Sequence, residues 1–261
     1  GAGAGSDVSD DQYRAVGCDV LDEREAVFER ADVVVQVRGL GATDGGTDPY
    51  AEGQTVVGLL GPYGIEAEID ELAQRRVNAF ALELIPRISR AQSMDALSAM
   101  SSIGGYRAVI RAAEQLPKFF PLLTTAAGTV KPARVLVLGA GVAGLQAIAT
   151  AKRLGARVFG YDIREPTREE VESLGADFVE LEVDIEADED EDGYAEELEK
   201  EKQERQPELL KPHIAEAAVV VSTALIPGQP APLLINEEAV AAMAPGSVIV
   251  DLAAPNGGNC A

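Results

Sequence analysis

Cysteine and long apolar runs are both scarce in this sequence. Its two cysteines, Cys18 and Cys260, lie at opposite ends of the chain, and two such residues do not make a disulfide framework. No stretch of about 18 or more apolar residues is present, so the sequence offers no candidate transmembrane helix. It has no signal-peptide pattern either. From these absences we expect a reducing, cytoplasmic setting.

Positive charge is scarce as well. The 261 residues include 22 Lys and Arg against 44 Asp and Glu, for a formal net charge of −22. This balance argues against nucleic-acid binding, which requires a basic surface. The acidic excess extends through the chain, and lysine is rarer than arginine. Because net charge keeps a protein soluble when salt screens repulsion, we expect adaptation to high salt; an ordinary acidic protein is the alternative.

The first half of the chain alternates strand-like and helical patterns. Three short runs have the apolar, β-branched composition that is typical of buried parallel strands: residues 32–39, 54–61 and 78–84. Residues 65–76 have helical spacing, and 94–116 read as one long helix. We therefore expect a truncated Rossmann-like domain over residues 1–120 that ends in a long linking helix. The domain boundary is placed between residues 116 and 133, near the loop-like segment 117–133.

The second half repeats this alternation more regularly. The expected strands are residues 134–139, 156–162, 177–183, 218–225 and 247–253. The expected helices are residues 142–155, 167–175, 207–217 and 233–246. This order predicts a doubly wound parallel sheet over residues 121–261. The predicted fold class is α/β, with two Rossmann-like doubly wound parallel-sheet domains and a cofactor cleft between them.

A strongly acidic run, residues 182–205, interrupts the alternation. One interpretation is a solvated surface insertion. The other is a mobile loop near 184–206 that covers a ligand, since long polar insertions in compact domains often act as lids. Gly193 and Tyr194, in the middle of the run, would then supply a hinge and an aromatic cover.

A glycine motif follows the first strand of the second half. Gly139, Gly141 and Gly144 form the G-x-G-x-x-G pattern between that strand and a helix. The three glycines permit a tight turn, a close approach to a pyrophosphate, and packing of the helix on the strand. The next strand ends at Asp162, near the spacing expected for a carboxylate that binds the ribose 2′-OH. We expect NAD(H) to be preferred over NADP(H), although Arg164 is close enough to accept a phosphate.

A polar segment, PRISRAQSMD (residues 86–95), follows an apolar run and precedes the long helix. It brings two arginines, a glutamine, two serines and an aspartate together at the end of an expected strand. One interpretation is a cofactor-binding loop. The other is a loop that caps the following helix, with Ser93 or Asp95 as the N-cap residue.

Four stretches together resemble one known family. PRISRAQSMDALS, RVLVLGAGVAGLQAI, STALIPGQPAP and SVIVDLAAPNGGNC are similar to the soluble NAD(H)-binding domain of the alpha subunit of proton-translocating transhydrogenases. The resemblance covers essentially the whole chain, without the family's first strand region and C-terminal segment, so we interpret the chain as a fragment of a longer subunit. It implies direct hydride transfer from NADH to NADP⁺, which needs two nicotinamide rings held close together with water excluded.

By this resemblance, three side chains position the reacting nicotinamide without acting as an acid or a base. Arg87 contacts the carboxamide or nearby ribose, Gln92 lies between the two rings, and Asp95 helps to orient the ring. The other cofactor contacts that the resemblance and the glycine motif imply are Ile88, Ser89, Arg90, Ser98, Gly139, Gly141, Val142, Gly144, Asp162, Ile163, Arg164, Gly193, Tyr194, Gln206 and Leu225. No metal ligand is implied.

The resemblance also implies partners. NADP(H) would be held by a partner domain, and a membrane-spanning domain or subunit would couple hydride transfer to proton translocation. The chain would be a homodimer, peripheral on the cytoplasmic face of the plasma membrane.

Two other functions remain open at this point. Alanine dehydrogenase shares the fold, and its family uses a lysine and a histidine of the first domain. Here the corresponding stretches, VVVQVRG and VVGLLGPYG, contain neither, and the one histidine is His213 in the second half. An amino-acid dehydrogenase without a placed acid or base is disfavoured. The third possibility is an NAD-binding module without catalytic activity.

Overall fold

The computed structural model describes residues 2–40, 49–86, 88–181, 205–226 and 228–261. By contacts the chain divides into two compact units, Gly1–Leu97 and Ser98–Ala261. In the part of the chain so described, no helix is long and apolar enough to cross a membrane.

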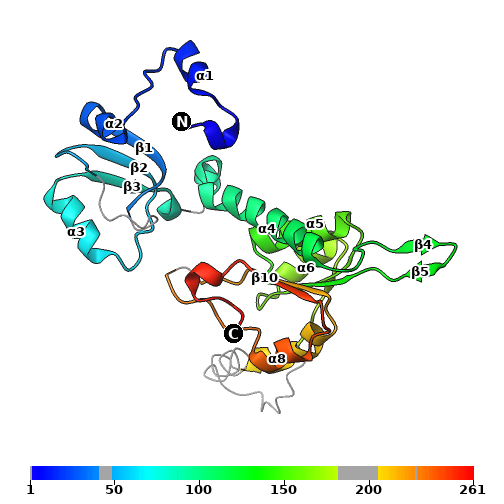
Figure 1. The fold of residues 1–261 in the computed structure, drawn as a ribbon. Helices are drawn as coiled ribbons and strands as arrows, with labels where there is room; N and C mark the ends of the chain where they lie inside the picture. The colour runs from blue at the N-terminus through cyan, green and yellow to red at the C-terminus, as the bar shows by residue number, and fades with distance from the viewer. Residues whose placement is uncertain (1, 41–48, 87, 182–204, 227) are drawn as a thin grey trace, which may run out of the picture. The chain divides into compact units, whose positions relative to one another are not determined.

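The first unit contains a three-stranded parallel sheet in the order β1-β2-β3 (Figure 1). Its strands are β1 (Val33–Arg38), β2 (Thr55–Leu59) and β3 (Asn78–Ala81). Its helices are α1 (Asp10–Ala15), α2 (Arg24–Arg30) and α3 (Glu66–Gln74), with single-turn 3₁₀ segments at Ala4–Ser6 and Leu82–Leu84 and a longer one at Ser89–Met94. The three expected strands and the expected helix of this half are confirmed, although the third strand is shorter than predicted.

The core of this unit lies on one face of the sheet. Val34 and Val56 pack with Phe28 of α2 and Leu72 of α3. The alternate residues of β1 are exposed: Val33 by 56%, Val35 by 76% and Val37 by 80%. The expectation that this strand is buried on both faces is therefore wrong, because successive side chains of a strand point to opposite faces and α2 and α3 pack on one of them.

The second unit is built on a five-stranded parallel sheet in the order β10-β9-β6-β7-β8. Its strands are β6 (Arg134–Leu138), β7 (Arg157–Tyr161), β8 (Asp177–Phe178), β9 (Val219–Ser222) and β10 (Val248–Asp251). Its helices are α4 (Ala96–Gln115), α5 (Val142–Arg153), α6 (Thr167–Ser173), residues 205–215 and α8 (Glu237–Ala242), with a 3₁₀ turn at Ala254–Asn256. The strand order reverses between β6 and β9, as in doubly wound folds.

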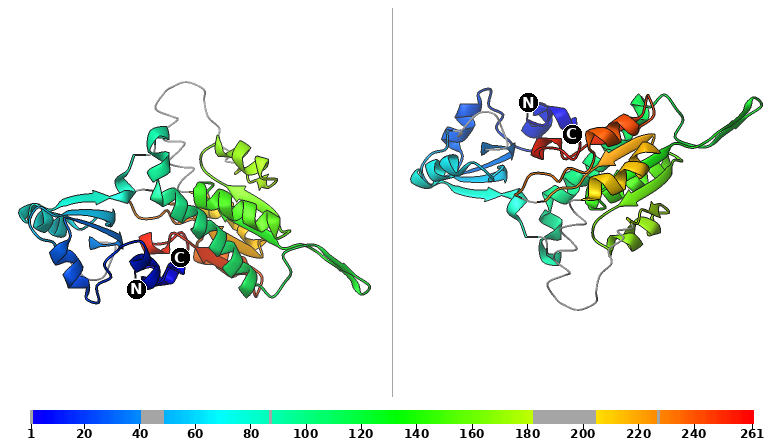
Figure 2. Two further views of the ribbon diagram at one scale, coloured as in Figure 1. Left: turned by 90° about the horizontal axis from the view of Figure 1, so that it is seen from above. Right: turned by 90° about the horizontal axis from the view of Figure 1, so that it is seen from below.

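Helices cover both faces of this sheet (Figure 2). Val135 and Val137 of β6 pack with α4, α5 and α6. Leu136 and Leu138, on the opposite face, pack with residues of the 205–215 helix and of α8. All four side chains are fully buried, and each such burial contributes about 1.5–3 kcal/mol to stability. The predicted doubly wound sheet is confirmed for this half.

The long helix α4 belongs by its contacts almost wholly to the second unit, whereas from the sequence it was expected at the end of the first domain. A Cβ added at Gly105 would lie 2.0 Å from the carbonyl oxygen of Ala143. The glycine therefore lets α4 approach the start of α5 closely, which gives it a packing role in a helix where glycine otherwise costs stability.

Two further segments differ from the sequence expectations. Residues 117–133, expected as a loop, contain an antiparallel hairpin of β4 (Leu123–Thr125) and β5 (Gly128–Val130) that extends away from the second sheet (Figure 1). Of the strand expected over 177–183, the described residues form β8, which pairs with β7 and is the last strand in the order of the described sheet. Most of the acidic run lies outside the described residues.

Candidate functional site

The glycine motif forms the turn between β6 and α5, next to the point where the strand order reverses. Gly139 has φ +95°, a conformation that favours glycine, and its N–H donates to the Tyr161 carbonyl at 2.8 Å. A Cβ added at Gly144 would lie 1.8 Å from the Gly139 carbonyl oxygen. Both glycines are therefore required for the turn and for the packing of α5 against it.

Gly141 has a different role in the same turn. A Cβ added there would meet no described atom within 4 Å, so the backbone at Gly141 borders open space. Gly141 is the N-cap of α5 and provides no side-chain hydrogen bond to the first turn, which starts at the half-exposed Val142. Open space in front of helix amide groups fits the pyrophosphate of a dinucleotide.

Thr223 supports this turn from the neighbouring strand. Its Oγ1 donates to the carbonyl of Gly139 at 3.0 Å and lies 3.3 Å from that of Leu138. Thr223 falls within the motif STALIPGQPAP, but no role was predicted for it. Its contact joins residues 84 positions apart, and only the order of β6 and β9 would have indicated it.

Asp162 lies at the end of β7, beside the glycine turn. Its side chain is 7% exposed, and its Oδ2 accepts a hydrogen bond from the Ala140 N–H at 2.7 Å. The Arg164 side chain forms two hydrogen bonds with the two carboxylate oxygens, both 2.9 Å long. Burial alone would raise the pKa of the Asp162 carboxyl, but the hydrogen bonds from Arg164 and Ala140 outweigh it and lower that pKa. Burial, and then the charge of Asp162, raise the pKa of Tyr161 to about 12.

A pocket of about 230 Å³ opens beside this carboxylate. It brings together three predicted site residues, Asp162, Ile163 and Gln206. Its other lining residues were not predicted from the sequence; they are Tyr161, Glu165, Arg168, Phe178, Val179, Glu180, Leu181 and Leu209. Gln206 is only 6% exposed, so it contributes a polar side chain to this pocket from a buried position.

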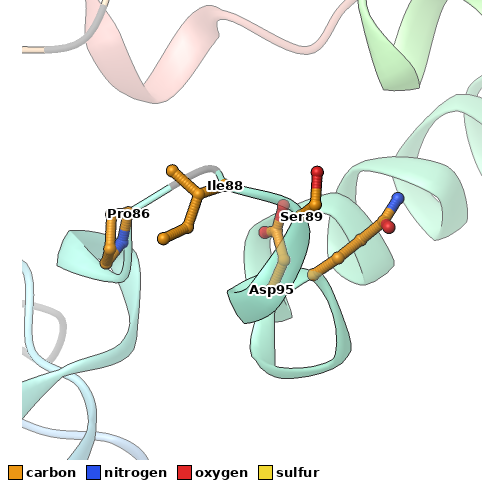
Figure 3. A pocket seen from close by; sticks show the side chains of 5 residues that line it. Pro86, Ile88, Ser89 and Asp95 are labelled. Carbon is orange, nitrogen blue, oxygen red and sulfur yellow. The ribbon is translucent and has the colours of Figure 1, made fainter.

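A second pocket, of about 260 Å³, lies in the first unit (Figure 3). Its lining residues come from the predicted polar segment and are Pro86, Ile88, Ser89, Gln92 and Asp95. Arg90 is exposed and is not among them. Ser98 lies in the first turn of α4, and its carbonyl accepts from the Ser102 hydroxyl at 3.1 Å. The structure thus brings four of the predicted residues of this segment together.

Glu83 precedes this pocket in the chain and was not predicted from the sequence. Its Oε1 accepts hydrogen bonds from the backbone N–H groups of Leu60 and Gly61 at 2.9 and 2.5 Å. The carboxylate thereby ties the carboxyl end of β2 to the segment that leads into the pocket. The only signal in the sequence is an acidic residue inside the apolar run NAFALEL.

The remaining predicted cofactor contacts either line neither pocket or lie outside the described residues. Leu225 and its neighbour Ile226 follow β9 and are 50% and 45% exposed. Arg87, Gly193 and Tyr194 lie outside the described residues, so their assignments stay predictions.

Two family models together match nearly the whole chain. The model described as "Alanine dehydrogenase/PNT, N-terminal domain" matches residues 1–104, and that described as "Alanine dehydrogenase/PNT, C-terminal domain" matches residues 108–261. The chain belongs to the alanine dehydrogenase/PNT family. The resemblance identified from the sequence motifs is thereby confirmed at the level of the family.

Individual relatives differ in their similarity to the chain. It is 47% identical over 264 residues to an NAD(P) transhydrogenase alpha-subunit chain of Rhodospirillum rubrum, covering 100% of this chain and 69% of that protein. The crystal structure of transhydrogenase from Sinorhizobium meliloti matches with a TM-score of 0.84 and 45% identity, over 100% of this chain and 69% of that one. An alanine dehydrogenase of Methanococcus maripaludis is 28% identical, over 99% of this chain and 64% of that protein. The chain is therefore a homologue of transhydrogenase alpha subunits, and its α/β two-domain fold class is confirmed.

Proposed function

We propose that this chain is the NAD(H)-binding component of a proton-translocating NAD(P)⁺ transhydrogenase. The identity to transhydrogenase alpha subunits exceeds that to alanine dehydrogenase, at 47% against 28%. The observation that carries the cofactor assignment is the buried carboxylate of Asp162 at the end of β7, next to the open space at Gly141. A carboxylate at this position receives ribose hydroxyls and repels a 2′-phosphate.

The chain's own residues would divide the work of holding NAD(H). The amide groups at the start of α5 would receive the pyrophosphate. Asp162 would bind the adenosine ribose, with Ile163, Arg164 and Gln206 around it. Bound NADH supplies the hydride.

At the nicotinamide end, the residues position and shield rather than exchange protons. Arg87, Gln92, Asp95 and Ser98 would orient the ring. The set of cofactor contacts would be completed by Ile88, Ser89, Arg90, Val142, Gly193, Tyr194 and Leu225. Hydride transfer between two nicotinamides needs this alignment and exclusion of water, and no acid or base.

The partners belong to the same proposal. NADP(H) would be bound by a separate domain, and a membrane-spanning domain or subunit would couple the transfer to proton movement. The chain would act as a homodimer on the cytoplasmic face of the membrane. Its acidic surface would suit high salt.

Alanine dehydrogenase activity is the second candidate, and the position of His213 argues against it. His213 lies in the helix of residues 205–215. Burial and the nearby charge of Arg134 lower its pKa. Arg134 begins β6, and the glycine turn follows the opposite end of that strand. A histidine at the amino end of the strand is poorly placed for acid–base chemistry on a substrate beside the cofactor.

The proposal is tested by mixing the chain with the NADP(H)-binding domain of a transhydrogenase and following hydride transfer from NADH to an NADP⁺ analogue. We expect transfer that depends on both proteins. The matched assay supplies L-alanine and NAD⁺ to the chain alone. NADH production in that assay would favour the dehydrogenase, and NADH binding without transfer would favour a non-catalytic NAD-binding module.

A further inference from the structure

The Asp162 carboxylate is fully occupied by hydrogen-bond donors. Oδ1 accepts from the Arg164 N–H and from Arg164 Nε, both at 2.9 Å. Oδ2 accepts from the Ala140 N–H at 2.7 Å and from Arg164 Nη2 at 2.9 Å. An ionised carboxylate offers about four acceptor positions. All four are in use, so a ribose hydroxyl can be received only if one of these donors leaves.

The four donors differ in how easily they can leave. The N–H groups of Ala140 and Arg164 are parts of the backbone at the glycine turn and at the end of β7. The Arg164 side chain is 61% exposed, whereas that of Asp162 is 7% exposed. An exposed guanidinium regains water when it leaves the carboxylate, which lowers the cost of its displacement. Arg164 is therefore the donor that a ribose would displace.

We propose that Arg164 competes with the adenosine ribose for Asp162 and so sets both the affinity for NAD(H) and the discrimination against NADP(H). This inference rests on the proposed function, because it requires NAD(H) to bind at Asp162. In the free protein, Arg164 neutralises a buried carboxylate. When NAD(H) binds, the ribose hydroxyls take the two positions that the guanidinium held.

The competition has opposite consequences for the two nucleotides. Removal of the Arg164 side chain leaves two acceptor positions open, so NADH binds without breaking an ion pair. NADPH carries a 2′-phosphate where the ribose meets Asp162, and the displaced guanidinium is the nearest charge that can pair with it. Loss of the Arg164 side chain should therefore strengthen NADH binding and weaken NADPH binding.

Salt provides an independent signature. Ions screen the exposed Arg164 guanidinium, less strongly than in a fully exposed pair because Asp162 is buried, so the competition weakens as ionic strength rises. The advantage of a variant without the Arg164 side chain should therefore be largest at low salt and shrink at high salt.

The experiment measures NADH and NADPH binding by calorimetry at low and high salt for the wild type and for Arg164→Gln. Arg157→Gln is the matched control, because Arg157 is also exposed, pairs with Asp177 at 3.3 Å, and lies at the opposite end of β7. We expect Arg164→Gln to bind NADH about three- to tenfold more tightly at low salt and NADPH more weakly. Arg157→Gln should match the wild type. Arg164→Lys keeps the positive charge but cannot form both side-chain hydrogen bonds to Asp162. Its affinities for NADH and NADPH should lie between those of the wild type and Arg164→Gln.

Two contrary outcomes are distinguishable. If the wild type binds NADH but Arg164→Gln binds it equally or more weakly, Arg164 does not compete with the ribose for Asp162. Weaker binding would mean that Arg164 contacts NADH directly, and equal binding that it has no role in NADH binding. If the wild type binds no NADH, the proposed function is itself overturned and the inference falls with it. Thermal unfolding of each variant confirms that it is folded.

Discussion

Two strands with the same three residues have different surroundings. Val33, Val34 and Val35 lie in β1 of the first unit, and Val219, Val220 and Val221 lie in β9 of the second. All three valines of β9 are fully buried, whereas in β1 Val34 is buried and both Val33 and Val35 are exposed. β9 pairs with strands on both sides and has helices on both faces, whereas β1 is an edge strand with helices on one. A β-branched run thus predicts a strand, but its neighbours decide how much of it is buried.

The largest expected effect on stability comes from placing one charged residue in β9 and, for comparison, in β1. Val220→Asp would place a carboxylate between two layers of the second unit, and we expect a loss of about 4 kcal/mol or more, enough to prevent folding. Val35→Asp, at a side chain that is 76% exposed, should change the free energy of unfolding by about 0.5 kcal/mol. Urea unfolding of both variants provides the measurement. Similar losses would mean that β1 is covered as fully as β9.

Within the second unit, alanine substitutions at two glycines should separate an effect on stability from an effect on NADH binding. Gly144→Ala should destabilise the protein by about 1–3 kcal/mol, because the added Cβ meets the Gly139 carbonyl. Gly141→Ala adds its Cβ to open space, so stability should hold while NADH binding falls by about tenfold or more. Unfolding and NADH titration are measured on both variants. If Gly141→Ala binds NADH as tightly as the wild type, the pyrophosphate does not bind at this turn.

In each unit a side chain described above joins the ends of two strands. Glu83→Ala leaves two partly buried backbone amides, of Leu60 and Gly61, without their acceptor, and we expect a loss of about 1–3 kcal/mol. Thr223→Val removes a neutral donor from the Gly139 carbonyl and should cost about 1 kcal/mol. Chemical denaturation compares the two, with Glu83→Gln as the conservative control. A smaller loss for Glu83→Ala than for Thr223→Val would show that this tie contributes little to the first unit.

These ties also show where prediction from sequence stops. The glycine turn and Asp162 could be predicted because strand, turn and spacing are consecutive along the chain. Thr223 and Glu83 could not, since each acts on residues that only the sheet order brings near. Gln206 was predicted from the family resemblance, but its burial depends on the surrounding pocket.

Other errors have a physical cause of the same kind. The hairpin over Leu123–Val130 was missed because its residues also suit a loop. The exposed face of β1 was missed because composition does not reveal which helices pack against a strand. In contrast, the parallel order of the second unit followed from regular alternation of strands and helices.

The smallest expected effect concerns His213. Burial, followed by the charge of Arg134, lowers its pKa from the ordinary 6.5. As the pH falls below about 6.5, His213 is protonated in the unfolded chain but not yet in the folded chain. The free energy of unfolding therefore declines until the pH reaches the pKa of His213 in the folded state. NMR titration of this single histidine should give a pKa below 6.5, and His213→Gln should flatten the decline. A pKa at or above 6.5 would contradict the burial of the His213 ring in the folded protein.

The most direct test of NAD(H) binding at Asp162 is calorimetric binding of NADH against NADPH, on the wild type and on Asp162→Ala. We expect the wild type to prefer NADH by about tenfold or more. Asp162→Ala should lose or reverse this preference, because Arg164 is then free for the 2′-phosphate. Equal binding of both nucleotides by the wild type, or a preference unchanged in Asp162→Ala, would contradict the assignment.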